Sequence, residues 1–209
     1  MIRKQSWFPV LYMFCVTALF SSIVIGFTRL TSERVEANQM LAFEKAVLSV
    51  LPGLYEEELS RLEMHKIFVE LVGEPDASSG EAYTLKEGGK IIAYALPISG
   101  RGFWAPIKGV IGIKVDGKTI TGIAFYEQNE TPGLGAEITR ESFTNQFRGK
   151  EISDSGEAIN IRGPGATLGN SDVHAVTGAT QTSNRVEKII NTALKKWRTE
   201  ATKNLKTGE

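Results

Sequence analysis

The chain has 209 residues, the length of one or two domains, and its 42% hydrophobic and 23% charged residues are ordinary for a globular protein. Lysine plus arginine and aspartate plus glutamate both number 24, and this neutral balance gives no support for a nucleic-acid partner. Cys15 is the single cysteine, which excludes an internal disulfide and a cysteine-rich metal or iron–sulfur site built by this chain alone. His65 and His174 show no metal-ligand spacing, so we expect no metal site.

The first 28 residues differ in composition from the rest. From Trp7 to Phe27 the chain runs for 21 residues without a charge, and a helix needs about 20 residues to cross a hydrocarbon core. This run is longer than the roughly 7–15 apolar residues of a cleaved signal peptide, and the residues that follow it make a poor cleavage site. The sequence therefore predicts an uncleaved membrane anchor.

The charges beside this run indicate its orientation. Arg3 and Lys4 precede it, whereas Arg29 and Arg34 follow it with acidic residues between them. Positive charges collect on the cytoplasmic side of a span, and acidic residues count little. The bias is small and favours an N-terminus inside, with residues 29–209 outside.

Two helices are expected after the anchor. Ser32 can cap one that ends at Pro52-Gly53, and this helix could continue the membrane helix as a stalk. Apolar positions at helical spacing predict an ordinary packing helix over residues 54–72.

Beyond residue 81 the chain changes to strands joined by glycine-containing turns. The Asp-Gly pair at residues 116–117 suits a tight hairpin turn. We expect two hairpins and two further short strands, at residues 83–86 with 90–96, 107–115 with 119–126, 158–161 and 173–176.

Two more helices complete the predicted fold. One covers residues 136–148, and a clearer one, capped by Thr182, Ser183 or Asn184, ends near Trp197. The fold class is therefore α+β, with one N-terminal transmembrane helix before a single, mainly antiparallel domain. The expected segments are a cytoplasmic tip and anchor at 1–28, a helical stalk and packing helices at 29–80, the domain at 81–200 and a polar tail at 201–209.

The first motif with chemical content immediately precedes the last helix. It reads Thr177-Gly178-Ala179-Thr180-Gln181-Thr182-Ser183. Gly178 permits a positive φ angle and a tight strand-to-helix turn. The unpaired N–H groups at a helix start favour a bound phosphate, and the neighbouring hydroxyls add donors. On spacing alone, an ordinary N-cap rich in serine and threonine is the simpler interpretation.

The second motif is a glycine-rich turn. It reads Glu130-Thr131-Pro132-Gly133-Leu134-Gly135. Pro-Gly at the centre of a turn suits type II geometry, and Gly135 would let the backbone approach a ligand closely. On composition alone, a plain turn between a strand and a helix is the simpler interpretation.

Together the two motifs resemble the FMN-binding domain that is shared by one subunit of the sodium-translocating NADH:quinone reductase and one subunit of the Rnf ion-translocating complex. In that family a Ser/Thr-Gly-Ala-Thr sequence carries FMN through a phosphoester on its last threonine, here Thr180, and a Glu-Thr-Pro-Gly-Leu-Gly segment precedes it. Residues 100–104, Gly-Arg-Gly-Phe-Trp, resemble the aromatic entry to a hairpin in the quinone-reductase member. The family usually has aspartate three residues before the motif, where this chain has His174, and Asp172 lies two residues away.

This resemblance implies an electron-transfer subunit of a membrane-bound, ion-translocating oxidoreductase. FMN would be bound covalently to Thr180, on the periplasmic side of the bacterial inner membrane. Its partners would be the other subunits of the complex and a flavin transferase. The residues that would bind the cofactor are Thr177, Gly178, Ala179, Thr180, Thr182, Ser183, Glu130, Thr131, Pro132, Gly133, Leu134 and Gly135.

Thr180 is expected to be an attachment point rather than a catalytic nucleophile. A threonine hydroxyl needs a base or a metal to activate it, and the sequence shows no nucleophile–base–acid set. A separate enzyme would therefore modify Thr180, and the redox chemistry would belong to the flavin. We expect the turn at residues 130–135 to lie against the flavin ring, with Leu134 as an apolar face and Glu130 or Thr131 near its polar edge.

Two other interpretations stay open. One is a freestanding, membrane-anchored flavoprotein that serves an extracytoplasmic electron chain. The other is a membrane-anchored sensor or assembly module without a cofactor.

Overall fold

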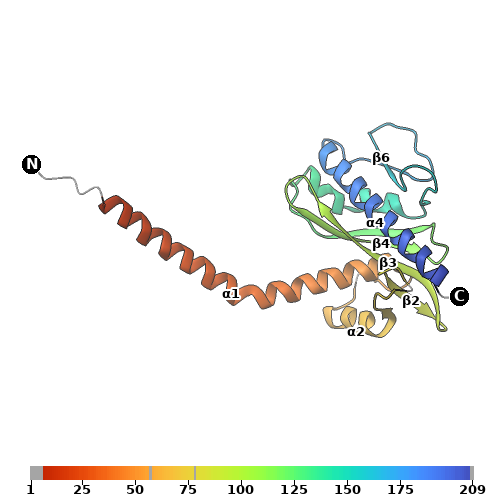
Figure 1. Cartoon of the computed structure of the whole chain (residues 1–209), viewed down its shortest axis with the longest axis horizontal. Coiled ribbons are helices and arrows are strands. Elements are labelled where there is room, and N and C mark those ends of the chain that lie inside the picture. Colours follow the sequence, from red (N-terminus) through yellow and green to blue (C-terminus); the bar gives the residue numbers. More distant parts are fainter. Residues whose placement is uncertain (1–6, 57, 78, 208–209) are drawn as a thin grey trace, which may run out of the picture. The chain divides into compact units, whose positions relative to one another are not determined.

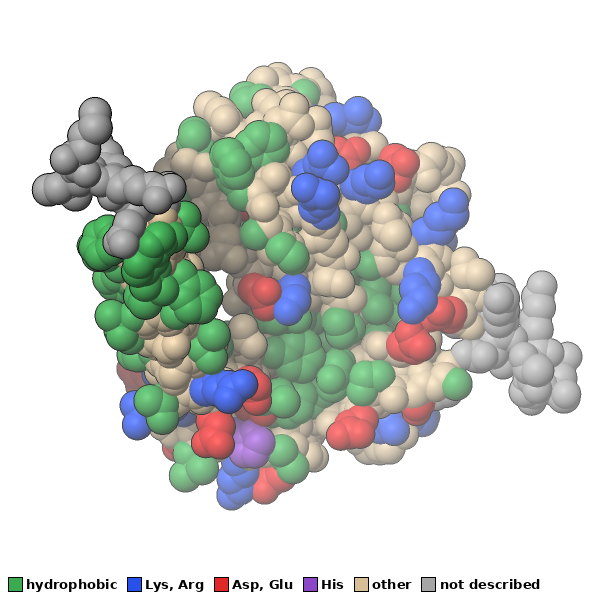
Figure 2. All heavy atoms as spheres, turned by 60° about the vertical axis from the view of Figure 1, so that its left-hand side comes forward, with side chains coloured by type: hydrophobic (Ala, Val, Ile, Leu, Met, Phe, Trp, Pro, Cys, Tyr) green, Lys and Arg blue, Asp and Glu red, His purple; other side chains and the backbone are tan. Residues whose placement is uncertain are grey.

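A computed structural model describes residues 7–56, 58–77 and 79–207. The chain forms two compact units, Met1–Met40 and Leu41–Glu209. The first unit contains the N-terminal part of helix α1, Phe8–Val50, which is long and apolar enough to cross a membrane (Figure 1). None of its most apolar stretch is buried in protein. Figure 2 shows hydrophobic side chains on the surface of this part of α1.

Helix α1 runs without a break from Phe8 to Val50, so the residues after the apolar run continue the same helix, as expected. The expected helix start at Ser32 is wrong. Its hydroxyl donates to the Arg29 carbonyl within the helix, at 3.0 Å, which is a bond made along a helix and not at its cap. The helix ends at Val50, just before Pro52 and Gly53, and Gly53 has a φ of +73°.

The second unit is built on a five-stranded antiparallel sheet. The two expected hairpins are confirmed, and a short edge strand precedes them. In spatial order the strands are β1 (Val72–Gly73), β2 (Tyr83–Glu87), β3 (Lys90–Arg101), β4 (Pro106–Lys114) and β5 (Ile120–Glu127). The other two expected strands, β6 (Asn160–Arg162) and β7 (Asp172–His174), pair in parallel in a separate small sheet. The mainly antiparallel α+β fold is thereby confirmed.

Three expected helices have different bounds. Helix α2, Arg61–Leu71, is shorter than expected because a capping box at Ser60 fixes its start. The helix expected over 136–148 is broken by Arg140, whose ψ of 149° is extended. Three short pieces replace it, η1 (Gly135–Thr139), α3 (Glu141–Thr144) and η2 (Asn145–Phe147).

The last helix, α4, runs from Thr180 to Thr207. It starts before the expected caps, because the Ser183 N–H already donates to the Ala179 carbonyl at 2.9 Å. It also continues beyond Trp197, whose indole N–H donates to the Ser79 carbonyl at 2.9 Å. Thr180, at the helix start, is exposed to solvent.

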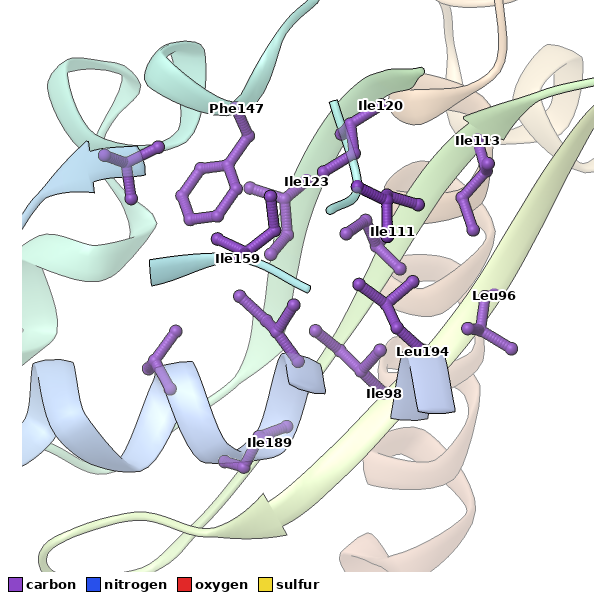
Figure 3. Close-up of a cluster of buried hydrophobic side chains, with 14 of the residues drawn as sticks. Leu96, Ile98, Ile111, Ile113, Ile120, Ile123, Phe147, Ile159, Ile189 and Leu194 are labelled. Atoms are coloured by element: carbon purple, nitrogen blue, oxygen red, sulfur yellow. The ribbon is translucent and has the colours of Figure 1, made fainter. Parts of the chain in front are cut away.

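Both faces of the sheet are covered, and each cover forms a hydrophobic core. Helix α4 and the segments around η2 pack on one face, where Ile111, Ile190 and Leu194 are fully buried (Figures 1 and 3). Helix α2 and the C-terminal turns of α1 pack on the other. The buried carboxyl of Glu44 on α1 contacts His65 Nδ1 there at 2.8 Å. The first core fixes the start of α4 relative to the strand ends, where the two sequence motifs meet.

Candidate functional site

A tight turn leads from strand β7 into helix α4. Gly178 has a φ of +78°, as the sequence predicted, and the Ala179 N–H donates to the Val176 carbonyl at 3.1 Å. The buried Ser183 hydroxyl accepts from the Val176 N–H at 3.2 Å, so it closes the turn from inside. Thr180 is exposed at the first helical position, where backbone N–H groups have no acceptor within the helix.

The glycine-rich turn has the expected type II features. Its N–H···O bond runs from Leu134 to Thr131 at 3.1 Å, and Gly133 has a φ of +74°. Gly135 is buried, and a Cβ there would lie 2.5 Å from Thr182 Oγ1 and 2.9 Å from Glu130 Cβ. The close approach at Gly135 is therefore made by side chains of the protein itself.

A third loop, residues 102–105, completes the site. The Gly102 N–H donates to the Ala105 carbonyl at 2.9 Å and closes the loop. The Phe103 and Trp104 rings meet edge to face, 5.0 Å apart at 76°, and the indole N–H donates to the Thr131 hydroxyl at 3.2 Å. These two aromatic residues were absent from the site predicted from sequence. Two adjacent aromatic residues in a glycine-rich turn were the available signal.

The three segments enclose a cavity of about 380 Å³. Its residues are Phe103, Trp104, Glu130, Thr131, Leu134, Gly135, Gly178, Ala179, Thr180, Gln181 and Thr182. Both sequence motifs thus contribute to one site. Four predicted residues, Pro132, Gly133, Thr177 and Ser183, do not line it. Thr177 and Gly133 instead line an adjacent cavity of about 340 Å³.

The residues before the Thr-Gly-Ala-Thr motif are held within the small sheet. The Gly169 N–H, which donates to Asp172 at 2.8 Å, holds the pKa of that carboxyl below its ordinary value. Partial burial opposes this effect, while Asn160 and Arg162 add to the lowering of the pKa. Asp172 is thus engaged away from the motif. His174 is held through its backbone N–H, which donates to the side chain of Gln146 at 2.7 Å.

The cavity fits a flavin nucleotide in size and in chemistry. Its volume falls within the roughly 300–1,000 Å³ of ligand sites in proteins. One end is the start of α4, where partial positive charge and free N–H groups favour a phosphate. The lining also includes the exposed side chains of Phe103, Trp104 and Leu134, which suit an apolar ring.

Residues 102–195, which contain all three segments, match the FMN-binding domain family. These residues therefore form a domain that is similar to that family. It is 40% identical over 118 residues to the NqrC subunit of the Na(+)-translocating NADH-quinone reductase of Vibrio vulnificus (strain YJ016), an alignment that covers 55% of this chain and 46% of that protein. The same subunit of the Yersinia pestis reductase is 40% identical over 115 residues, 53% of this chain and 43% of that protein. The chain is homologous to these subunits, which confirms the resemblance seen in the sequence, and it spans about half the length of the curated relatives it matches.

Two solved structures share the fold. The NqrC subunit of the Na(+)-translocating NADH-quinone reductase from Parabacteroides distasonis superposes with a TM-score of 0.67 at 24% identity, covering 83% of this chain and 96% of that one. Shewanella oneidensis NqrC gives the same TM-score at 20% identity, covering 79% and 99%. At these identities the likeness establishes the fold alone.

Proposed function

We propose that this protein is the electron-carrying, NqrC-like subunit of a membrane-bound reductase of the Na(+)-translocating NADH-quinone type, with FMN linked by a phosphoester to Thr180. The observation that carries the proposal is the cavity that joins exposed Thr180 to an apolar rim. When bound, FMN supplies the electron-transfer chemistry, and the residues of the chain bind, orient and shield it.

The position of Thr180 supports a role as attachment point. Its side chain is exposed, so a modifying enzyme can reach the hydroxyl. The first turn of α4 would stabilise the negative charge of the phosphoester once it forms. Among the described residues that line the cavity, none is a histidine, lysine or cysteine, and the one carboxylate, Glu130, already accepts hydrogen bonds from the protein through both oxygens.

A separate flavin transferase would form the bond. Direct condensation of a phosphate with a hydroxyl is unfavourable in water, so an activated donor is needed, and a flavin dinucleotide meets this requirement. The Thr180 Oγ1–P bond would form as the pyrophosphate bond breaks. The nucleoside monophosphate would leave, and the hydroxyl proton would pass to a base of the transferase.

The ring would lie over Leu134 and the aromatic loop. Leu134 is 44% exposed and borders Gly178, where an added Cβ would lie 3.1 Å from Leu134 Cδ2. This closeness brings the leucine to the turn that carries Thr180. The Thr131 hydroxyl accepts from the indole of Trp104 and keeps its own proton free to donate to a polar edge of the ring.

The quinone-reductase relatives suggest the partners in this proposal. We assign the chain to that type rather than to the Rnf type, with the other reductase subunits as its partners. Helix α1 would anchor it as a single span, and the positive residues before the span would place the FMN-binding domain on the periplasmic side of the inner membrane. A covalent tether suits that side, where a lost FMN is not readily replaced.

Protein isolated from its native membrane tests the proposal. We expect a yellow band that fluoresces in a denaturing gel, and its loss in Thr180→Ala. The other reductase subunits should co-purify with the wild-type chain. A fluorescent chain that purifies alone would support a freestanding flavoprotein, and a colourless chain would support a sensor or assembly module.

A further inference from the structure

The carboxyl group of Glu130 connects three separate segments of the site. It is 5% exposed. Its Oε1 accepts from the backbone N–H groups of Phe103, at 2.9 Å, and Trp104, at 3.0 Å. Its Oε2 accepts from the Thr182 hydroxyl at 2.6 Å. One buried side chain therefore joins the aromatic loop, its own turn and the first turn of α4.

Two glycines make room for this carboxyl group. A Cβ at Gly102 would lie 2.6 Å from Glu130 Oε1, and a Cβ at Gly135 would lie 3.0 Å from Glu130 Oε2. Any larger residue at either position would displace the carboxyl or the loop. Each oxygen of the Glu130 carboxyl therefore lies beside a glycine, in space that a side chain would otherwise fill.

The aromatic loop depends on these bonds because its rings are little buried. Phe103 is 47% exposed and Trp104 is 67% exposed, so packing alone does not fix them. Hydrogen bonds from two consecutive backbone N–H groups to the buried Glu130 carboxyl hold the main chain instead. The edge-to-face contact of the two rings and the indole bond to Thr131 then set the side chains.

We propose that Glu130 is a positioning residue, which sets the aromatic loop against the flavin-bearing start of α4, and that Thr182 serves this contact and does not bind the flavin. The inference rests on the proposed function, since it assumes a flavin on Thr180. It assigns to Glu130 and Thr182 a role inside the protein wall, and leaves the ring to Phe103, Trp104 and Leu134. Glu130 acts on the flavin only through the loop.

Hydrogen exchange on the full-length chain tests the contact without any flavin, in a Thr180→Ala background. We expect Glu130→Ala to accelerate exchange of the Phe103 and Trp104 amides at least tenfold. Glu130→Gln should restore most of the protection, because its amide oxygen accepts from both N–H groups and the Thr182 hydroxyl can turn to accept from its NH₂. Glu70→Ala, which removes an exposed carboxyl on α2, is the matched control and should leave both amides unchanged.

Flavin-loaded chains test the consequence for the cofactor. Thr182→Val keeps the shape of the side chain and the Glu130 carboxyl but removes their bond. It should speed exchange of the two loop amides and shift both the visible spectrum and the midpoint potential of the flavin. Thr182→Ser retains a hydroxyl that can donate to Glu130. Its loop exchange, visible spectrum and midpoint potential should therefore stay close to those of the wild type.

Three results would overturn the inference. Unchanged loop exchange in both Glu130→Ala and Thr182→Val would show that the bonds of Glu130 do not hold the aromatic loop. Faster exchange with an unaltered flavin spectrum and potential reduces Glu130 to a purely structural role. If Thr182→Val changes the spectrum or midpoint potential of the flavin but not the loop exchange, Thr182 binds the flavin directly. A wild-type chain that carries no flavin would refute the proposed function. That outcome is distinguishable from failure of the Glu130 contact, because exchange of the two loop amides is measured without any flavin.

Discussion

Replacing Gly135 with alanine tests whether this position must be glycine because of close packing within the protein or because a ligand approaches its backbone. The added Cβ would lie 2.5 Å from Thr182 Oγ1 and 2.9 Å from Glu130 Cβ, both closer than ordinary carbon contacts. Overpacking of a buried position costs about 1–3 kcal/mol. We therefore expect Gly135→Ala to lose about 1–3 kcal/mol of folding stability even when no flavin is attached.

Thermal unfolding of the full-length chain in detergent measures this loss. Combining the substitution with Thr180→Ala provides protein without covalent flavin. For a domain of this size, about 1 kcal/mol corresponds to a Tm change of about 2–4 °C. The signal is tryptophan fluorescence, to which Trp197 of α4 contributes a buried indole that is 5% exposed and packed in the core.

Gly163→Ala is the matched control for this experiment. A Cβ at Gly163 has no atom within 4 Å, and its φ lies outside the left-handed region. That substitution should be neutral or stabilise by up to about 1 kcal/mol, through the lower entropy of the unfolded chain. Equal Tm values for Gly135→Ala and Gly163→Ala without flavin would refute the reasoning. Gly135 would then be needed for the close approach of a ligand and not for packing within the protein.

Three further predictions follow from the contacts described. Leu134→Ala should shift the spectrum and midpoint potential of the flavin while attachment persists, and an unchanged redox titration would remove Leu134 from the ring. His65→Ala should cost about 1–3 kcal/mol in chemical unfolding, because it removes a hydrogen-bond partner of the buried Glu44 carboxyl; a loss below about 0.5 kcal/mol would contradict this. Because the pKa of Asp172 is lowered in the folded protein, its contribution to stability is present above the unfolded pKa, about 3.9, and is lost as the pH falls through the lower folded value. Asp172→Asn should therefore flatten the acid side of the stability–pH curve, and an identical acid limb would count against the assignment.

Local features of the site could be predicted from the sequence because they depend on neighbouring residues. Gly178 and Gly133 take the positive φ angles that their turns require, and Thr180 lies at a helix start. The predicted cap lay three to five residues too late, since the polar side chains of Thr182, Ser183 and Asn184 are all typical of caps. The first hydrogen bond of the helix runs from the Ser183 N–H to the Ala179 carbonyl, which places Ala179 at the cap position, and alanine is not a preferred capping residue.

The contacts of Glu130 could not be predicted in the same way. Its partners lie 26, 27 and 52 residues away in the chain, and only the folded sheet and α4 bring them together. The sequence therefore suggested that Glu130 faces the flavin, whereas both of its oxygens accept hydrogen bonds from the protein. The helix expected over 136–148 failed for a related reason. Apolar spacing continues through Arg140, but its extended backbone breaks the helix so that Ile138 and Phe143 both reach the core.

The covalent link is the central claim, and mass measurement on protein from the native membrane tests it most directly. The intact chain should exceed its sequence mass by one FMN less one water. Fragmentation should place that mass on Thr180, and Thr180→Ala should remove it while α4 stays folded. An unmodified wild-type chain, or flavin mass on Thr177 or any other residue of the peptide, would contradict the account.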